Sequence, residues 1–181
     1  SEWHKLIEHA RSKNVNFLVS AFSVKAISDL KKLGLKRIKL GSAESIDPIM
    51  RKQAIKQNFE IILSNGLDKK RLLEIGLEMA KEGTKVSLLE CTSAYPSSLE
   101  QFNRESFERI LGSQDLIGAG ISDHSGETLM AKYEIVKGCD MIEAHIAFDK
   151  KMFGPDSVAS LTPKQWAEIV EFKNGINIIN N

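Results

Sequence analysis

The sequence of 181 residues lacks the features that mark a secreted, membrane-embedded or nucleic-acid-binding protein. It has only two cysteines, Cys91 and Cys139, and their isolation predicts small buried side chains in a reducing cytoplasm. No apolar run approaches the roughly 18 residues that span a bilayer, and the amino end is polar. The formal net charge is +1 with no basic stripe, which disfavours a nucleic-acid partner. These absences favour a cytoplasmic enzyme domain.

One pattern repeats along the chain: a short apolar run rich in β-formers, a few polar or small residues, then an amphipathic helix. A helix over 2–12 precedes the first run. Asp47-Pro48 and Thr162-Pro163 each place a capping residue before a first-turn proline, and Gln165 completes a capping box. The predicted strands are residues 16–20, 37–40, 60–64, 85–90, 118–122 and 140–145.

This alternation predicts a parallel sheet with right-handed crossovers, either open or closed into a barrel. The chain has no Gly-x-Gly-x-x-Gly after a strand and no Walker-type loop, so nothing supports a nucleotide crevice. Polar residues instead end nearly every strand, which favours a TIM (β/α)8 barrel whose loops face one central site. Only about six βα units are present, so we expect an incomplete barrel spanning 1–181 as a single domain.

Two histidines, His124 and His145, each close one of two consecutive predicted strands. The ends of neighbouring parallel strands lie roughly 5 Å apart, so both imidazoles could reach one metal ion of catalytic type. Asp123 and Glu143 stand beside them and could act in a second shell or as water-positioning bases. The alternative is that each histidine only forms hydrogen bonds within the barrel mouth.

Six short segments together resemble the N-acetylneuraminate (sialic acid) synthase family, in the family's order and at similar spacing from about Trp3 to Val170. The resemblance implies a TIM barrel that condenses phosphoenolpyruvate with an N-acyl hexosamine such as N-acetylmannosamine, using a divalent metal. It implies Mn²⁺, with Mg²⁺ or Co²⁺ as options, and a homodimeric full-length protein. The chain would supply barrel strands three to eight, without the first two strands and the carboxyl-terminal antifreeze-like domain. The segments are Lys39-Leu40-Gly41-Ser42-Ala43-Glu44, Ser64-Asn65-Gly66, Cys91-Thr92-Ser93-Ala94-Tyr95-Pro96, Gly120-Ile121-Ser122-Asp123-His124, Glu143-Ala144-His145 and Gly154-Pro155-Asp156.

The same resemblance assigns roles to individual residues. His124 and His145 would bind the metal and act in catalysis with Glu143 and Asp123. Tyr95 and Asp156 would contact the sugar. A turn or a helix cap is the ordinary role of an isolated serine or aspartate at such positions. The phosphoenolpyruvate-binding residues would be Lys39, Ser20, Ser42, Ser64, Ser93 and Ser122.

Four residues depart from the family's pattern. Glu90 stands where the family has His or Gln, Asn65 replaces Thr, Ala144 replaces Lys or Arg, and Ser157 replaces His. We expect the lost basic residue at Ala144 and the gained carboxylate of Glu90 to make the site more acidic and to shift the acceptor towards modified hexoses, such as those that lead to legionaminic or pseudaminic acid. Two other functions remain open: another phosphoenolpyruvate-dependent aldol-type synthase, and a non-catalytic anion-binding barrel fragment.

Overall fold

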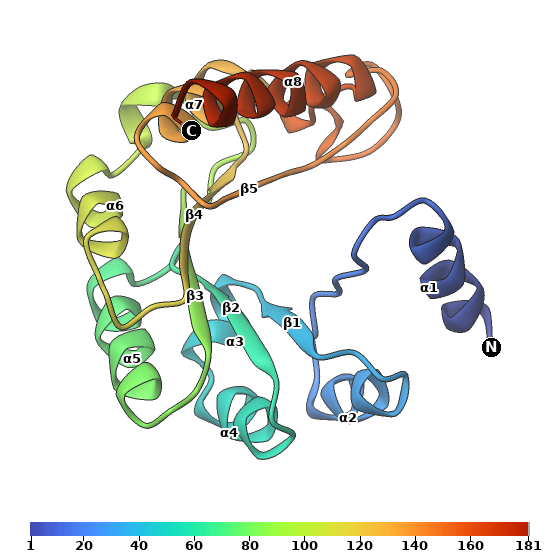
Figure 1. The fold of residues 1–181 in the computed structure, drawn as a ribbon, viewed down its shortest axis with the longest axis vertical. Helices are drawn as coiled ribbons and strands as arrows, with labels where there is room; N and C mark the ends of the chain where they lie inside the picture. Colours follow the sequence, from blue (N-terminus) through green and yellow to red (C-terminus); the bar gives the residue numbers. More distant parts are fainter. Residues whose placement is uncertain (181) are drawn as a thin grey trace.

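A computed structural model describes residues 1–180 and shows a five-stranded parallel sheet curled into a half barrel (Figure 1). The strands follow one another in chain order, and each pairs only with its sequence neighbours within the sheet. Their carboxyl ends therefore meet along one edge. The strands are β1 (Arg37–Leu40), β2 (Glu60–Ser64), β3 (Val86–Cys91), β4 (Gly118–Asp123) and β5 (Met141–Ala144).

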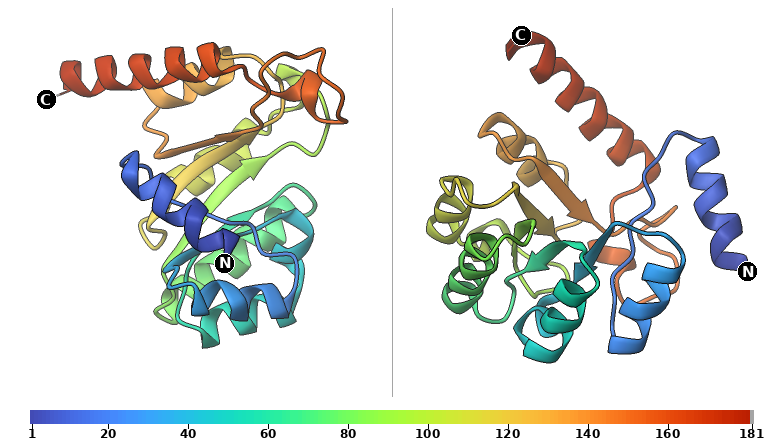
Figure 2. Two further views of the ribbon diagram at one scale, coloured as in Figure 1. Left: turned by 90° about the vertical axis from the view of Figure 1, so that its right-hand side faces the viewer. Right: turned by 60° about the horizontal axis from the view of Figure 1, so that its bottom comes forward.

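Helices cover the outer face of the sheet, as the end-on view in Figure 2 shows. α7 and α8 pack together beside β5, and α1 lies apart from the strands at the amino end. None of the helices in the described part of the chain is both long and apolar enough to cross a membrane. The helices are α1 (Glu2–Ser12), α2 (Val24–Lys32), α3 (Ser42–Ile46), α4 (Pro48–Lys56), α5 (Lys69–Lys81), α6 (Arg104–Leu111), α7 (Leu129–Val136) and α8 (Pro163–Asn180).

The two predicted helix starts are confirmed. The Asp47 carboxylate accepts a hydrogen bond of 2.7 Å from the Ile49 amide, and Pro48 takes the first turn of α4. At α8 the Gln165 amide donates to the Thr162 hydroxyl, and the Gln165 side chain accepts from the Thr162 amide over 2.9 Å. This reciprocal pair is the capping box that the sequence predicts.

Side chains alternate between the two faces of the sheet, and this alternation positions the site. Ile38 and Leu40 of β1 pack with the outer helices, which leaves Lys39 on the inner face. The inner face is tightly packed at Gly120 of β4. A Cβ there would lie 2.5 Å from the Met141 carbonyl oxygen, so only glycine fits. Outer positions hold the core, and inner positions near the carboxyl ends hold the chemistry.

The predicted first strand, 16–20, is wrong. Only Ser20 pairs with the sheet, through a single parallel bridge to Lys39. The bridge uses the Val19 carbonyl and the Ala21 amide, and Leu18 just before it is exposed. The segment touches the edge of β1 for one residue pair and then leaves it, so the sheet has five strands rather than six. The bounds of the other predicted strands hold within one residue at each end.

Candidate active site

A cavity of about 570 Å³ lies at the carboxyl edge of the sheet. The structure brings all the predicted site residues to it except Asp123 and Asp156. Convergence follows from the topology, because parallel strands in sequential order end at a common edge. The lining residues are Ser20, Phe22, Lys39, Gly41, Ser42, Ala43, Glu44, Ser64, Cys91, Ser93, Tyr95, Ser122, His124, Glu143, Ala144 and His145.

A buried lysine and a carboxylate pair across the floor of this cavity. Lys39 Nζ lies 3.1 Å from Glu143 Oε1, and the Ser122 hydroxyl donates to the same oxygen over 2.8 Å. The Lys39 side chain is only 11% exposed, so the ion pair compensates a charge that water cannot reach freely. The cavity therefore holds a buried lysine that is paired with one carboxylate.

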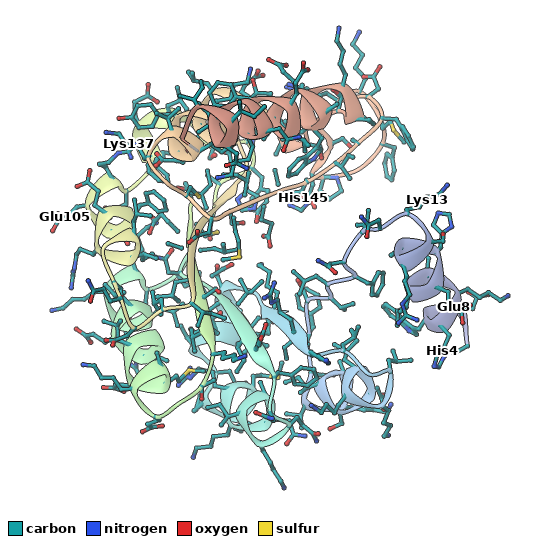
Figure 3. The ribbon with its side chains drawn as sticks, in the orientation of Figure 1. His4, Glu8, Lys13, Glu105, Lys137 and His145 are labelled. Atoms are coloured by element: carbon teal, nitrogen blue, oxygen red, sulfur yellow. The ribbon has the colours of Figure 1, made fainter. Side chains whose placement is uncertain are left out.

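The two histidine rings face each other with centroids 5.4 Å apart. Figure 3 shows His145 on the inner side of the arc, just after β5. His124 is buried, and its Nδ1 lies 2.9 Å from the Thr92 carbonyl oxygen, so Nδ1 carries the proton and Nε2 keeps its lone pair. Burial also lowers the pKa of His124, which favours the neutral ring. A neutral imidazole with an oriented lone pair is the form that binds metal ions.

Tyr95 covers both imidazoles from the loop after β3. Its ring centroid lies 4.1 Å from that of His124 and 5.8 Å from that of His145. Burial is the main cause that raises the pKa of Tyr95, and the nearby negative charges of Asp156 and Glu143 add to it. The phenol therefore stays neutral. Tyr95 is half exposed and presents an aromatic face and a hydroxyl at the opening of the cavity.

A group of hydroxyls surrounds Gly66 in the loop after β2. The Gly66 amide donates to the Ser42 hydroxyl over 3.1 Å, and the Ser93 hydroxyl donates to the Gly66 carbonyl over 3.3 Å. A Cβ on Gly66 would clash with both serine oxygens, so the close approach requires glycine. Beside this group the Ser64 hydroxyl is buried and has no hydrogen-bond partner among the described residues. A buried hydroxyl without a partner is costly and marks a place for a ligand atom.

Asp123 and Asp156 lie outside the cavity. Asp123 is buried on the opposite side of β4 from Ser122, where its carboxylate accepts from the Ser125 amide over 2.9 Å and from the Ser125 hydroxyl over 3.1 Å. Burial raises the pKa of Asp123 against the effect of these hydrogen bonds. Asp156 is half-buried in the turn before a 3₁₀ helix (Ser157–Ala159). Asp123 thus shapes the loop that carries His124. Asp156 affects the site through Tyr95, because its negative charge helps to raise the pKa of that phenol.

Comparison with known proteins places this site in a family. The NeuB family profile matches residues 1–179. The chain belongs to the NeuB family. It is 34% identical to the N,N'-diacetyllegionaminic acid synthase of Campylobacter jejuni over 90% of its own length, and 31% identical to the pseudaminic acid synthase of Helicobacter pylori over 94%. The chain spans about half the length of these curated relatives, 50% and 51% respectively.

A solved NeuB-type structure has the same fold. The N-acetylneuraminic acid (sialic acid) synthetase of Leptospira borgpetersenii, crystallised with citrate, superposes with a TM-score of 0.90 at 25% sequence identity. The match covers 99% of this chain and 63% of that protein. The resemblance to sialic acid synthases that the motifs indicate is therefore confirmed at the level of family and fold.

The expectation that Glu90 makes this NeuB site more acidic is wrong. Glu90 points to the outer face of β3, where its side chain is fully buried and pairs with Lys69 of α5. Its carboxylate also accepts from the Asn65 amide over 2.7 Å and from the Ser106 hydroxyl over 2.6 Å. The Asn65 side-chain oxygen in turn accepts from the Cys91 amide over 2.9 Å. Glu90 and Asn65 therefore form one buried network behind the cavity, and neither faces it.

Two contributions to the NeuB site are absent from the predictions. Glu44, in α3, lines the cavity two residues after Ser42. Its short distance in sequence from Ser42 was the signal that could have indicated a place in the site. The Thr92 carbonyl orients His124 through a main-chain atom, which no side-chain pattern reveals. Cys91 is buried as expected, yet its sulfur borders the cavity 3.8 Å from the Ser42 hydroxyl.

Proposed function

We propose that this chain is part of the catalytic domain of a nonulosonic acid synthase, which condenses phosphoenolpyruvate with an N-acyl hexosamine and releases phosphate. The observation that carries the proposal is the buried Ser64 hydroxyl without a partner, in one cavity with the lysine Lys39. A hydrogen-bond donor and a fixed cation in a half-closed site suit a small, multiply charged anion. Family membership supports the same reaction class.

The anion would lie along the inner ends of β1, β2 and β4. Lys39 supplies the charge, and Ser64 and Ser122 supply neutral donors from separate strands. The hydroxyls of Ser20, Ser42 and Ser93 border the same cavity and complete the predicted set. These donors would hold phosphoenolpyruvate so that its C3 faces the open-chain aldehyde of the sugar. C3 bonds to the aldehyde carbon, water adds at C2, and phosphate leaves.

The histidine pair fits a divalent metal, and Mn²⁺ is our proposal. The described residues include no group of three or more His, Cys, Asp or Glu side chains with metal-holding geometry, so His124 and His145 would bind the ion without a third such ligand. Open positions would remain for water and substrate, as in a catalytic site. A bound ion would polarise the sugar aldehyde and stabilise the alkoxide that develops on its oxygen. Glu143 lines the same cavity and would hold a water or accept its proton.

The acceptor would be a modified hexosamine that stacks against Tyr95. Because Glu90 lies behind the cavity, the acidity that favours an altered sugar cannot come from it. Ala144, which replaces a basic residue of the family, does line the cavity. Two of the relatives are named for legionaminic and pseudaminic acids, which supports a sugar other than plain N-acetylmannosamine.

The decisive experiment measures phosphate release from phosphoenolpyruvate with a panel of N-acyl hexoses, with and without Mn²⁺, on the full-length protein. Release that depends on an N-acyl hexosamine is expected. Release with other aldoses alone would assign another aldol-type synthase. Phosphoenolpyruvate binding without release would assign a non-catalytic anion-binding barrel.

Lys39→Met is expected to raise the phosphoenolpyruvate dissociation constant tenfold or more, because a charge-assisted contact contributes about 1.5–3 kcal/mol. Isothermal titration calorimetry measures the change directly. Lys36→Met, which removes an exposed lysine three residues earlier, is the matched control and should leave the dissociation constant unchanged. An effect of Lys39→Met confined to sugar binding would assign the residue to the acceptor instead.

Ser64→Ala separates a binding role from a structural one. Removing a buried hydroxyl that lacks a partner should raise the free energy of unfolding by about 1 kcal/mol, while phosphoenolpyruvate binding weakens about tenfold. Ser45→Ala is the control: its hydroxyl donates to the Leu40 carbonyl and accepts from the Ser64 amide, so its loss should destabilise the chain. Urea unfolding and calorimetry test both variants. A destabilised Ser64→Ala with unchanged binding would contradict the assignment.

A further inference from the structure

The carboxylate of Glu143 lies where an oxygen of the bound anion would lie. Lys39 Nζ and the Ser122 hydroxyl both contact Glu143 Oε1, at 3.1 Å and 2.8 Å. These two donors stand on β1 and β4, with two strands between them, and meet at one atom. The Ser122 hydroxyl has a single proton, so an anion that accepts from it has to replace Glu143 as the acceptor.

We propose that Glu143 is an internal placeholder, which holds Lys39 and Ser122 in the ligand-free protein and is displaced when the anion binds. This inference rests on the proposed function, since it takes Lys39 and Ser122 as the anion's donors. Glu143 thereby lowers the affinity of the site for anions, because an anion that binds has to replace the contacts that Glu143 already makes.

The surroundings of the three residues support an exchange rather than a permanent ion pair. The Lys39 side chain is 11% exposed and needs a partner at all times, whereas the Glu143 side chain is 36% exposed and can turn into solvent. Glu143 is also at the end of β5, whose residues are only half-buried along their length. The nearby Ser64 hydroxyl stays without a partner while Glu143 is in place, so the arriving anion gains a contact that the placeholder does not make.

Glu143→Gln tests the proposal in the metal-free chain, with inorganic phosphate as the probe and calorimetry as the measurement. The substitution keeps the shape of the side chain and removes its charge, so phosphate should bind at least tenfold more tightly. Glu143→Asp gives a second reading, because it keeps the charge but withdraws the carboxylate from Lys39. It too should strengthen phosphate binding. Circular dichroism verifies that each variant is folded.

Glu44→Gln is the matched control, since it removes one negative charge from the same cavity without touching the Lys39 contact. It should change phosphate affinity less than threefold. In a Lys39→Met background, Glu143→Gln should leave phosphate affinity almost unchanged, because the lysine that Glu143 would otherwise occupy is no longer present.

The outcomes separate this proposal from the proposed function. If phosphate binding depends on Lys39 but Glu143→Gln leaves it unchanged or weaker, the placeholder is wrong and the anion site stands. Equal gains from Glu44→Gln and Glu143→Gln would also overturn it, in favour of general charge repulsion. If phosphate binds neither the wild type nor Glu143→Gln, both the placeholder and the anion site are wrong. If phosphate binding is detected in Glu143→Gln but not in the wild type, the result supports the role of Glu143 as a placeholder.

Discussion

His124→Ala and His145→Ala are each expected to abolish Mn²⁺ binding by the chain. Their rings lie 5.4 Å apart at the ends of β4 and β5, and loss of either leaves a single imidazole. Each substitution removes half of the proposed protein ligands, and a single neutral imidazole competes poorly with water for a divalent ion. The amount of free Mn²⁺ in solution, followed by electron paramagnetic resonance during titration, gives the dissociation constant.

The exposed histidines of α1 provide the control for this prediction. His4→Ala and His9→Ala remove the same side chain from the surface and should leave Mn²⁺ affinity unchanged. Unchanged affinity in either His124→Ala or His145→Ala would falsify the shared site.

The two variants should differ in stability, because the two histidines are buried to different degrees. His124 is 5% exposed and contacts the Thr92 carbonyl, whereas His145 is only half-buried. His124→Ala leaves that carbonyl without its donor, which costs about 1–3 kcal/mol. Thermal melting should therefore show a lower transition for His124→Ala than for His145→Ala, independent of metal.

The sequence predicts the convergence of the site well, and the reason is topological. Lys39, Ser64 and Ser122 each lie at the end of a predicted strand or one residue before it, and sequential parallel strands can only present their ends at one edge. The caps at Asp47 and Thr162 also follow from local chemistry, since a cap and its partner lie within three residues. Features that depend on neighbours in the chain, or on the direction of the strands, can therefore be predicted from the sequence.

Features that depend on residues far away in the sequence cannot be predicted in this way. Residues 16–20 have the composition of a strand, but pairing needs a neighbour along the whole run, and β1 forms only the single bridge at Ser20. Glu90 ends a predicted strand as Ser64 does, yet it points outward because Leu89 and Cys91 take the inner face. Its position depends on Lys69, which lies on a helix 21 residues earlier.

That outward position gives Glu90 a structural task. Its side chain is fully buried, and Lys69 is the one cation that contacts it among the described residues. Lys69 Nζ also donates to the Cys91 carbonyl over 2.8 Å, so the pair ties α5 to the end of β3. Asn65, the first residue after Ser64 at the end of β2, donates to the same carboxylate, and the network therefore supports the cavity from behind.

Lys69→Met is expected to lower the free energy of unfolding by about 3–5 kcal/mol, because it leaves the Glu90 carboxylate buried with only neutral donors. Urea unfolding at neutral pH measures the loss. Adding Glu90→Gln to Lys69→Met removes the buried charge and should restore most of the stability, whereas Lys70→Met, at the exposed neighbour on α5, should change it by no more than about 0.5 kcal/mol. A small effect of Lys69→Met, or no recovery in the double variant, would mean that Asn65 and Ser106 alone compensate the carboxylate. In that case α5 is held to the sheet by its apolar face, through Leu72 and Leu73, rather than by the ion pair.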